Sequence, residues 1–163
     1  IVAQPYAGLS DRDAFDIASL TRLAIDLNDL DPNAVLLVIG RNHERGHKYN
    51  QELCPEVLRN VTNLIDRLNI RVAYSLVAQC DAFVGAHSNL IRAAWDHRRR
   101  TALVIPDPMM TNHLPKLDPK YTYGLKHSEN RTFTFPFGPE YDVPRRMDLL
   151  DTGALARFLL RGE

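Results

Sequence analysis

Short aliphatic runs alternate along the chain with longer segments in which apolar residues recur every three or four positions. Continuous apolar runs are typical of strands buried on both faces of a parallel sheet. They predict strands at 1–5, 34–39, 61–65, 82–84, 101–105 and 131–137. The helical spacing predicts helices at 11–30, 70–79, 89–97 and 152–161, and a short helix at 50–59 that Pro55 makes difficult.

Two of these helices carry more detailed predictions. Ser10 or Asp11 is the expected N-cap of the helix at 11–30, because short polar side chains accept hydrogen bonds from helix-start N–H groups. In the helix at 70–79 we expect four apolar side chains to face inward: Val72, Ala73, Leu76 and Val77.

The order of the elements predicts the fold class. Strands and helices alternate at spacings that suit βαβ crossovers. We therefore predict an α/β, Rossmann-like domain, a three-layer parallel sheet with helices on both faces. Ligands on such sheets bind at the carboxyl ends of the strands, which directs attention to the loops at 6–12, 40–48, 85–89 and 106–112.

The length of 163 residues fits one domain with its own core. Residues 1–106 form the expected regular βα core, and residues 107–163 a proline-rich, irregular segment that ends in a helix. The chain opens with Ile1 inside a strand-like run. We therefore expect it to be one domain excised from a longer, two-domain protein.

The charge balance argues against nucleic acid as a partner. Twenty basic residues offset twenty acidic ones, whereas a phosphate-backbone binder needs a net basic face. The local cluster Arg98-Arg99-Arg100 follows a predicted helix, where we expect solvated side chains that complement the helix dipole. No run approaches the roughly 20 apolar residues that span a bilayer.

Two cysteines, Cys54 and Cys80, provide neither a disulfide framework nor a metal-like spacing. Cys80 stands among apolar residues, where we expect a small core side chain. This usage favours a reducing compartment, and we predict a cytoplasmic protein.

The strand at 82–84 breaks at small and polar residues, 85–89, before a helix begins. Such a turn leaves backbone N–H groups unpaired at the helix start, where the helix dipole also favours an anion. The donors would be the amides near Ser88, Asn89 and Leu90, and Arg92 lies one turn further on. The alternative is that Ser88 is only an N-cap and Arg92 a surface residue.

Residues 60–95 resemble the donor-binding half of family 9 glycosyltransferases, the heptosyltransferase-like enzymes of the GT-B fold. That family has a helix with L-A-x-L-I-x-x-A-D and then V-G-N-D-S-G-x-x-H-L-A-A-A, where this chain has LVAQCD at 76–81 and VGAHSN at 84–89. More faintly, QPYA at 4–7 is similar to the family's H-P-G-A, and VIG at 38–40 with Glu44 is similar to L-x-G-x-x-x-E. About two-thirds of the chain is covered.

The resemblance implies a site for the donor diphosphate. It places there Ser88, Asn89, Leu90, Arg92 and His87, with Ser10 and Arg12 in the first loop, where the family usually offers a lysine. Around them we predict a nucleoside and sugar pocket that includes Gly40, His43, Glu44 and Asp107, although a polar loop residue is the plainer interpretation of His43.

Three positions depart from the family pattern. His87 stands where the family has Asp, Asn89 where it has Gly, and Arg92 where it has His. The pattern Ser-Asn-x-x-Arg is also similar to the donor domain of GT-B fucosyltransferases. The sugar and the nucleotide base therefore stay open.

By resemblance, this is the carboxyl-terminal half of a metal-independent glycosyltransferase that needs no cofactor. Its partner would be a nucleotide sugar, whose departing diphosphate the helix start and Arg92 stabilise. The catalytic base and the acceptor (a glycan, lipid or protein) would belong to an N-terminal GT-B domain in the same chain. Peripheral membrane association of the full enzyme is compatible with this, and the domain alone should be inactive.

Two other functions stay open. The departures at His87 and Asn89 would suit a degenerate, non-catalytic module that binds a nucleotide or a partner on the same scaffold. A nucleoside deoxyribosyltransferase-like enzyme also opens with a strand that ends P-Y-x-G, but its catalytic glutamate has no counterpart in residues 89–97.

Overall fold

The computed structural model describes residues 1–5, 17–41, 58–85, 88–106, 130–135 and 149–163. Within these ranges six strands form one sheet in the order β3-β2-β1-β4-β5-β6. The strands are β1 (Val2–Gln4), β2 (Leu36–Val38), β3 (Val61–Asn63), β4 (Ala82–Gly85), β5 (Arg100–Pro106) and β6 (Asn130–Phe135). Every neighbouring pair is parallel. The predicted parallel α/β fold is confirmed.

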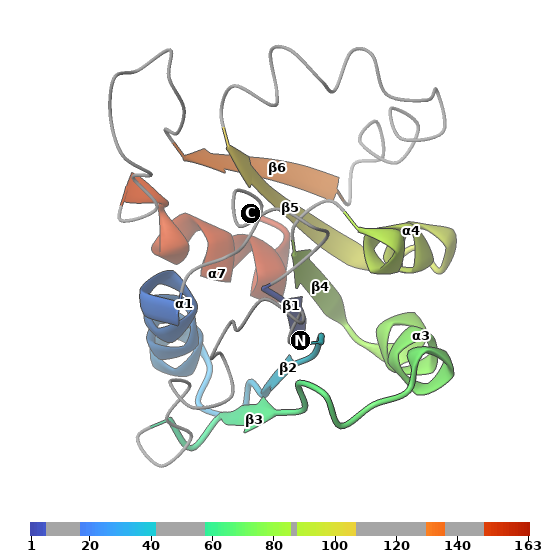
Figure 1. The fold of residues 1–163 in the computed structure, drawn as a ribbon. Coiled ribbons are helices and arrows are strands. Elements are labelled where there is room, and N and C mark those ends of the chain that lie inside the picture. The colour runs from blue at the N-terminus through green and yellow to red at the C-terminus, as the bar shows by residue number, and fades with distance from the viewer. Residues whose placement is uncertain (6–16, 42–57, 86–87, 107–129, 136–148) are drawn as a thin grey trace.

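Helices cover both faces of this sheet (Figure 1). They are α1 (Ile17–Leu30), α3 (Ile70–Gln79), α4 (Asn89–Asp96) and α7 (Thr152–Arg161). Helices α1 and α7 lie side by side on one face, and α3 and α4 lie together on the other. The domain therefore has three layers, with an apolar core on each side of the sheet.

Successive side chains of each central strand alternate between the two cores, as the pleat of a strand requires. In β4, Ala82 and Val84 belong to the core under α1 and α7, whereas Phe83 belongs to the core under α3 and α4. In β5, Val104 and Leu103 divide in the same way. Both sides of each strand are apolar, which explains the unbroken aliphatic runs in the sequence.

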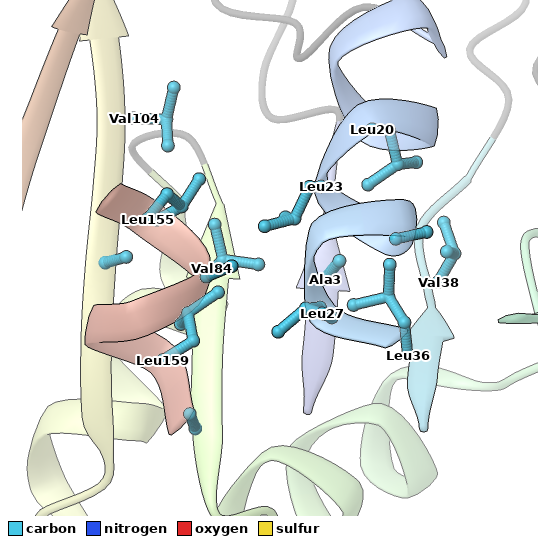
Figure 2. Packing of buried hydrophobic residues seen from close by; sticks show 14 of the residues in the cluster. Ala3, Leu20, Leu23, Leu27, Leu36, Val38, Val84, Val104, Leu155 and Leu159 are labelled. Carbon is cyan, nitrogen blue, oxygen red and sulfur yellow. The ribbon is translucent and has the colours of Figure 1, made fainter. Parts of the chain in front are cut away.

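Figure 2 shows the first core at close range. Leucines of α1 and α7 point at apolar side chains of β1, β2, β4 and β5; the labelled residues are Ala3, Leu20, Leu23, Leu27, Leu36, Val38, Val84, Val104, Leu155 and Leu159. Full burial of one leucine contributes about 1.5–3 kcal/mol. Two helices with repeated leucines therefore hold this face of the sheet.

The chain reverses its direction across the sheet at β1. From β1 it moves outward through β2 to β3, and it then returns to the other side of β1 to place β4, β5 and β6. In the chain, β1 is followed by α1 on one face of the sheet, and its neighbour β4 is followed by α4 on the other face. This topological switch point is where doubly wound sheets open a ligand crevice at their carboxyl edge.

Most predicted elements are confirmed, and the differences have physical causes. Residues 70–79 and 152–161 are helical as predicted. Val72 was expected to face inward and is 47% exposed, because α3 buries only Ala73 and Val77 against its neighbours. Leu58 and Arg59, at the end of the short helix predicted at 50–59, are not helical. The rest of that segment lies outside the described residues, and so do residues 11–16 and both candidate N-caps, Ser10 and Asp11.

The arginine cluster after α4 was predicted to be solvated, and two of its members are not. Arg98 is exposed, but Arg99 and Arg100 are half-buried. Arg100 is the first residue of β5, and its Nη1 donates to the Leu159 carbonyl in the last turn of α7 at 2.9 Å. It therefore complements the carboxyl end of α7, which lies next to it in the fold, instead of the end of α4.

None of the described helices is both long enough and apolar enough to cross a bilayer.

Candidate functional site

The backbones of β1 and β4 come very close at the switch point. Gln4 pairs with Gly85 at the carboxyl ends of the two strands. A Cβ atom at Gly85 would lie 2.9 Å from the Gln4 carbonyl oxygen and 3.2 Å from two atoms of the Phe83 ring. Glycine is therefore required here for space. The small residue that ended the apolar run in the sequence is what lets the two strands close up.

Ser88 links the start of α4 to the end of β1. It is the N-cap of α4, with extended backbone angles of φ −148° and ψ 171°. Its hydroxyl donates to Gln4 Oε1 across 2.5 Å, and both residues are half-buried. Within the described part of the chain, the Ser88 side chain makes no capping hydrogen bond to its own helix. It is thus an N-cap by position whose hydroxyl is used elsewhere.

Two other described helices begin differently. Asn69 Oδ1 accepts from the Val72 N–H at the start of α3 (3.0 Å). Asp151 Oδ1 accepts from the Ala154 N–H at the start of α7 (2.7 Å). The first four N–H groups of any helix have no partner inside it. Among the described residues, α3 and α7 each have a capping side chain for one of these donors, and α4 has none from Ser88.

The residues predicted to bind an anion at α4 play different parts. Leu90 is 5% exposed and its side chain belongs to the second core, so it offers the site its backbone N–H alone. The side chains of Asn89 and Arg92 are exposed. Arg92 is the fourth residue of the helix, one turn beyond Ser88. The predicted helix start at Ser88, Asn89, Leu90 and Arg92 is thus confirmed and lies beside the switch point, and the binding of an anion there stays a prediction.

Gly40 lies at the same edge of the sheet, just after β2. Its φ is +149°, and within the described residues no atom lies within 4 Å of an added Cβ. Its carbonyl accepts from the Asp66 N–H at 2.9 Å. Here glycine is needed for its backbone conformation, whereas at Gly85 it is needed for space.

The remaining predicted site residues, Ser10, Arg12, His43, Glu44, His87 and Asp107, lie outside the described residues. In the sequence they follow β1, β2, β4 and β5, whose carboxyl ends share one edge. Their assignment to the site stays a prediction.

Gln4 is a residue of the candidate site that the sequence did not predict. In the sequence it belongs to the segment QPYA, for which no role of Gln4 is expected. Its signal was its place, the last residue of a buried strand directly before Pro5. Its contact with Ser88 joins positions 84 residues apart, which local patterns do not report.

Cys80 is buried as predicted, and its Sγ contacts the Val77 carbonyl at 3.1 Å. Burial raises the pKa of its thiol, since an apolar environment disfavours the thiolate. It lies between α3 and the first residue of β4, at the opposite end of that strand from Gly85. Its role is in packing, away from the candidate site.

These features define a class. Six described strands in the order 3-2-1-4-5-6, helices on both faces, and a helix start beside the switch point are the arrangement of doubly wound α/β folds.

Comparison with known proteins agrees at the level of the fold. A solved structure of ADP-heptose lps heptosyltransferase II from E. coli matches 99% of this chain with a TM-score of 0.69 at 19% sequence identity. This chain spans 46% of that protein, a little under half. No family model matches the sequence, and no curated protein matches it. The predicted likeness to a heptosyltransferase is thus confirmed in the fold.

Proposed function

We propose that the protein is the donor-binding half of a GT-B glycosyltransferase and holds the diphosphate of a nucleotide sugar at the switch point. The observation that carries this proposal is the meeting of three features in one place: the close β1–β4 pair at Gly85, the start of α4, and a Ser88 hydroxyl that does not cap the helix. The heptosyltransferase-like fold supports it, because nucleotide ligands of doubly wound sheets lie at this edge.

The arrangement suits stabilisation of a leaving group. Glycosyl transfer from a nucleotide sugar expels a nucleoside diphosphate, so negative charge grows on its phosphate oxygens as the glycosidic bond breaks. The amides at the start of α4 are fixed dipoles directed at that charge. Arg92 adds a cation with a planar set of donors that suits phosphate oxygens. These groups would favour departure of the diphosphate without themselves reacting.

The other components of the reaction would come from elsewhere in the enzyme. The chain spans under half of the heptosyltransferase that it matches, so we place the general base and the acceptor on an N-terminal GT-B domain. The domain alone should bind the donor weakly and transfer nothing. A cytoplasmic location is part of the proposal, since Cys80 is a buried free thiol.

A second function, a non-catalytic nucleotide-binding or partner-binding module, is favoured by one observation. The Ser88 proton is directed at Gln4, within the protein, and not at the helix start where an anion would lie. A degenerate site would keep the scaffold and lose the ligand.

Titration calorimetry with ADP, GDP, UDP and CDP separates the two functions. We expect one of these nucleotides to bind in the micromolar to millimolar range and Arg92→Ala to weaken it by roughly 10- to 150-fold, the equivalent of about 1.5–3 kcal/mol for a hydrogen bond to a charged group. Arg161→Ala is the matched control, because it removes an exposed arginine from the last turn of α7, at the amino edge of the sheet.

The same titration tests independence from metal. Asp11 and Asp13 form an Asp-x-Asp pair that follows β1 in the sequence, a pairing that can hold Mg²⁺ on a nucleotide. If this pair held Mg²⁺, the affinity for the nucleotide would fall in EDTA. Because we propose a metal-independent site, we expect equal affinity in Mg²⁺ and in EDTA.

The titration also decides between the two proposed functions. If no diphosphate binds at millimolar concentration while the circular dichroism spectrum shows an intact fold, the degenerate module replaces the glycosyltransferase proposal.

A further inference from the structure

We propose that Gln4 is a positioning residue that decides whether Ser88 offers a proton or a lone pair to the ligand. The inference rests on the proposed function, because it concerns the same diphosphate site. Its basis is the hydrogen bond from the Ser88 hydroxyl to Gln4 Oε1, which joins the end of β1 to the start of α4.

A serine hydroxyl has one proton and two lone pairs. In this structure the Ser88 proton is directed to Gln4, so the oxygen can offer only lone pairs to a ligand. Phosphate oxygens of an ionised diphosphate are acceptors as well. The arrangement seen here therefore cannot give a hydrogen bond from Ser88 to a diphosphate, although the backbone amides of α4 can.

The carboxamide of Gln4 can turn so that Ser88 is able to donate to the ligand. A half-turn about its last side-chain bond exchanges Oε1 with Nε2 and changes little else in its shape. Nε2 then donates to the Ser88 oxygen, and the Ser88 proton is released to a phosphate oxygen. Binding of an anion is thus coupled to a half-turn of the Gln4 amide.

The rest of Gln4 is held in place while its end group turns. Its backbone belongs to β1, pairs with Gly85 and packs against the position where Gly85 has no Cβ. Ser88 is fixed in turn as the first residue before α4. Two rigid elements thus keep the hydroxyl and the amide within reach of each other, and only the direction of the hydrogen bond is free to change.

Replacement of Gln4 by glutamate separates this role from simple packing. A carboxylate has nearly the same shape as the amide, but when ionised it can only accept. In Gln4→Glu the Ser88 proton stays committed to residue 4, and the added charge also repels a diphosphate. A second substitution, Ser88→Ala, distinguishes the two effects, because charge repulsion acts with or without the hydroxyl.

The experiment is a double-mutant cycle with ADP, GDP, UDP or CDP, whichever the unaltered protein binds. We expect Ser88→Ala to weaken binding about tenfold when residue 4 is glutamine, the loss expected for a hydrogen bond to a charged group. In the Gln4→Glu background the same substitution should change the affinity less than twofold. A tenfold loss in both backgrounds, or no loss in either, overturns the role of Gln4 and leaves the proposed function standing.

A measurement on the unaltered protein keeps the inference testable if a variant does not fold. The Gln4 side-chain NH₂ pair should shift in a ¹⁵N–¹H spectrum when the nucleotide binds, and it should not shift in Ser88→Ala at the same occupancy. A pair that stays in place during saturation of the unaltered protein excludes the half-turn. If none of the four nucleotides ADP, GDP, UDP and CDP binds to the folded protein, the proposed function itself fails, and this inference fails with it.

Discussion

At the residue scale, the absence of a Cβ atom at Gly85 decides how closely β1 and β4 can approach. Its Cα faces the Gln4 carbonyl, and a methyl group would have to sit 2.9 Å from that backbone oxygen. Neither partner is a flexible chain end that could yield, because both belong to paired strands. The close approach of β1 and β4 at the switch point thus depends on the absence of a side chain at residue 85.

Gly85→Ala should lower the free energy of unfolding by about 1–3 kcal/mol, the usual cost of overpacking a filled interior. Urea unfolding followed by circular dichroism measures it. The cost arises because β1 and β4 must separate or Phe83 must turn. An unchanged midpoint would mean that the strands shift without penalty.

Gly153→Ala is the matched control. A Cβ at Gly153 would lie 3.5 Å from Asp151 Oδ1 and 3.6 Å from Arg157 Nη1, ordinary contact distances, on the second residue of α7. Alanine is the better helix former, so this change should raise the free energy of unfolding by about 0.5 kcal/mol. Opposite signs for the two glycines would locate the effect in the crowding at Gly85.

Some residues of the candidate site could be predicted from local sequence patterns, and the partner of Ser88 could not. The place of Ser88, Asn89, Leu90 and Arg92 at a helix start could be predicted from the sequence, because a strand that stops at a glycine and restarts as a helix produces a local pattern. The partner of Ser88 could not. Gln4 reaches Ser88 only because β1 inserts between β2 and β4, and no local pattern contains that information.

At the scale of elements, α7 depends on a residue from another part of the chain. Its start is capped by Asp151, and its end by Gly162, whose φ of +80° is the left-handed conformation that favours glycine. Arg100 adds a hydrogen bond to the Leu159 carbonyl. A helix that closes one core is therefore held at its end by the first residue of β5.

Arg100→Met should lower the free energy of unfolding by about 1 kcal/mol, since it removes a charge-assisted hydrogen bond from a half-buried helix end but keeps the length of the side chain. Urea unfolding gives the value. Arg161→Met, an exposed change in the same turn, should cost under about 0.5 kcal/mol. Equal costs for the two variants would mean that Arg100 stabilises the protein only through its charge and not through its hydrogen bond to Leu159.

In helix α3 the predicted bounds are correct, but the predicted inward-facing residues are not all buried. The helix runs from Ile70 to Gln79 as predicted, and the structure adds Asn69 as its N-cap. The side chains that face inward depend on the angle at which α3 meets the sheet and α4. Val72 lies outside that contact, and only the packed structure fixes the angle.

At the scale of the whole molecule, the buried Cys80 thiol links stability to pH. Burial raises its pKa in the folded protein, whereas in the unfolded chain the thiol titrates near about 8.5. Above that pH the unfolded state binds fewer protons than the folded state. Stability must therefore fall as the pH rises, from the unfolded pKa until the raised folded pKa is passed.

Urea unfolding at pH 7, 8, 9 and 9.5 tests this, with Cys80→Ala for comparison. We expect the unaltered protein to lose more stability between pH 8 and 9.5 than Cys80→Ala does, although the variant starts lower because it leaves a small cavity. Parallel curves would show that the alkaline loss comes from other groups.

The sequence by itself determined the kinds of elements and their alternation. Strands buried on both faces must be apolar throughout, and helices that cover them must be apolar at every third or fourth position, so both leave local patterns. Only the tertiary structure decided the order of the strands, and with it the meeting of Gln4, Gly85 and Ser88. That order follows from how the whole set of apolar faces is buried at once, a condition that no single segment of the chain carries.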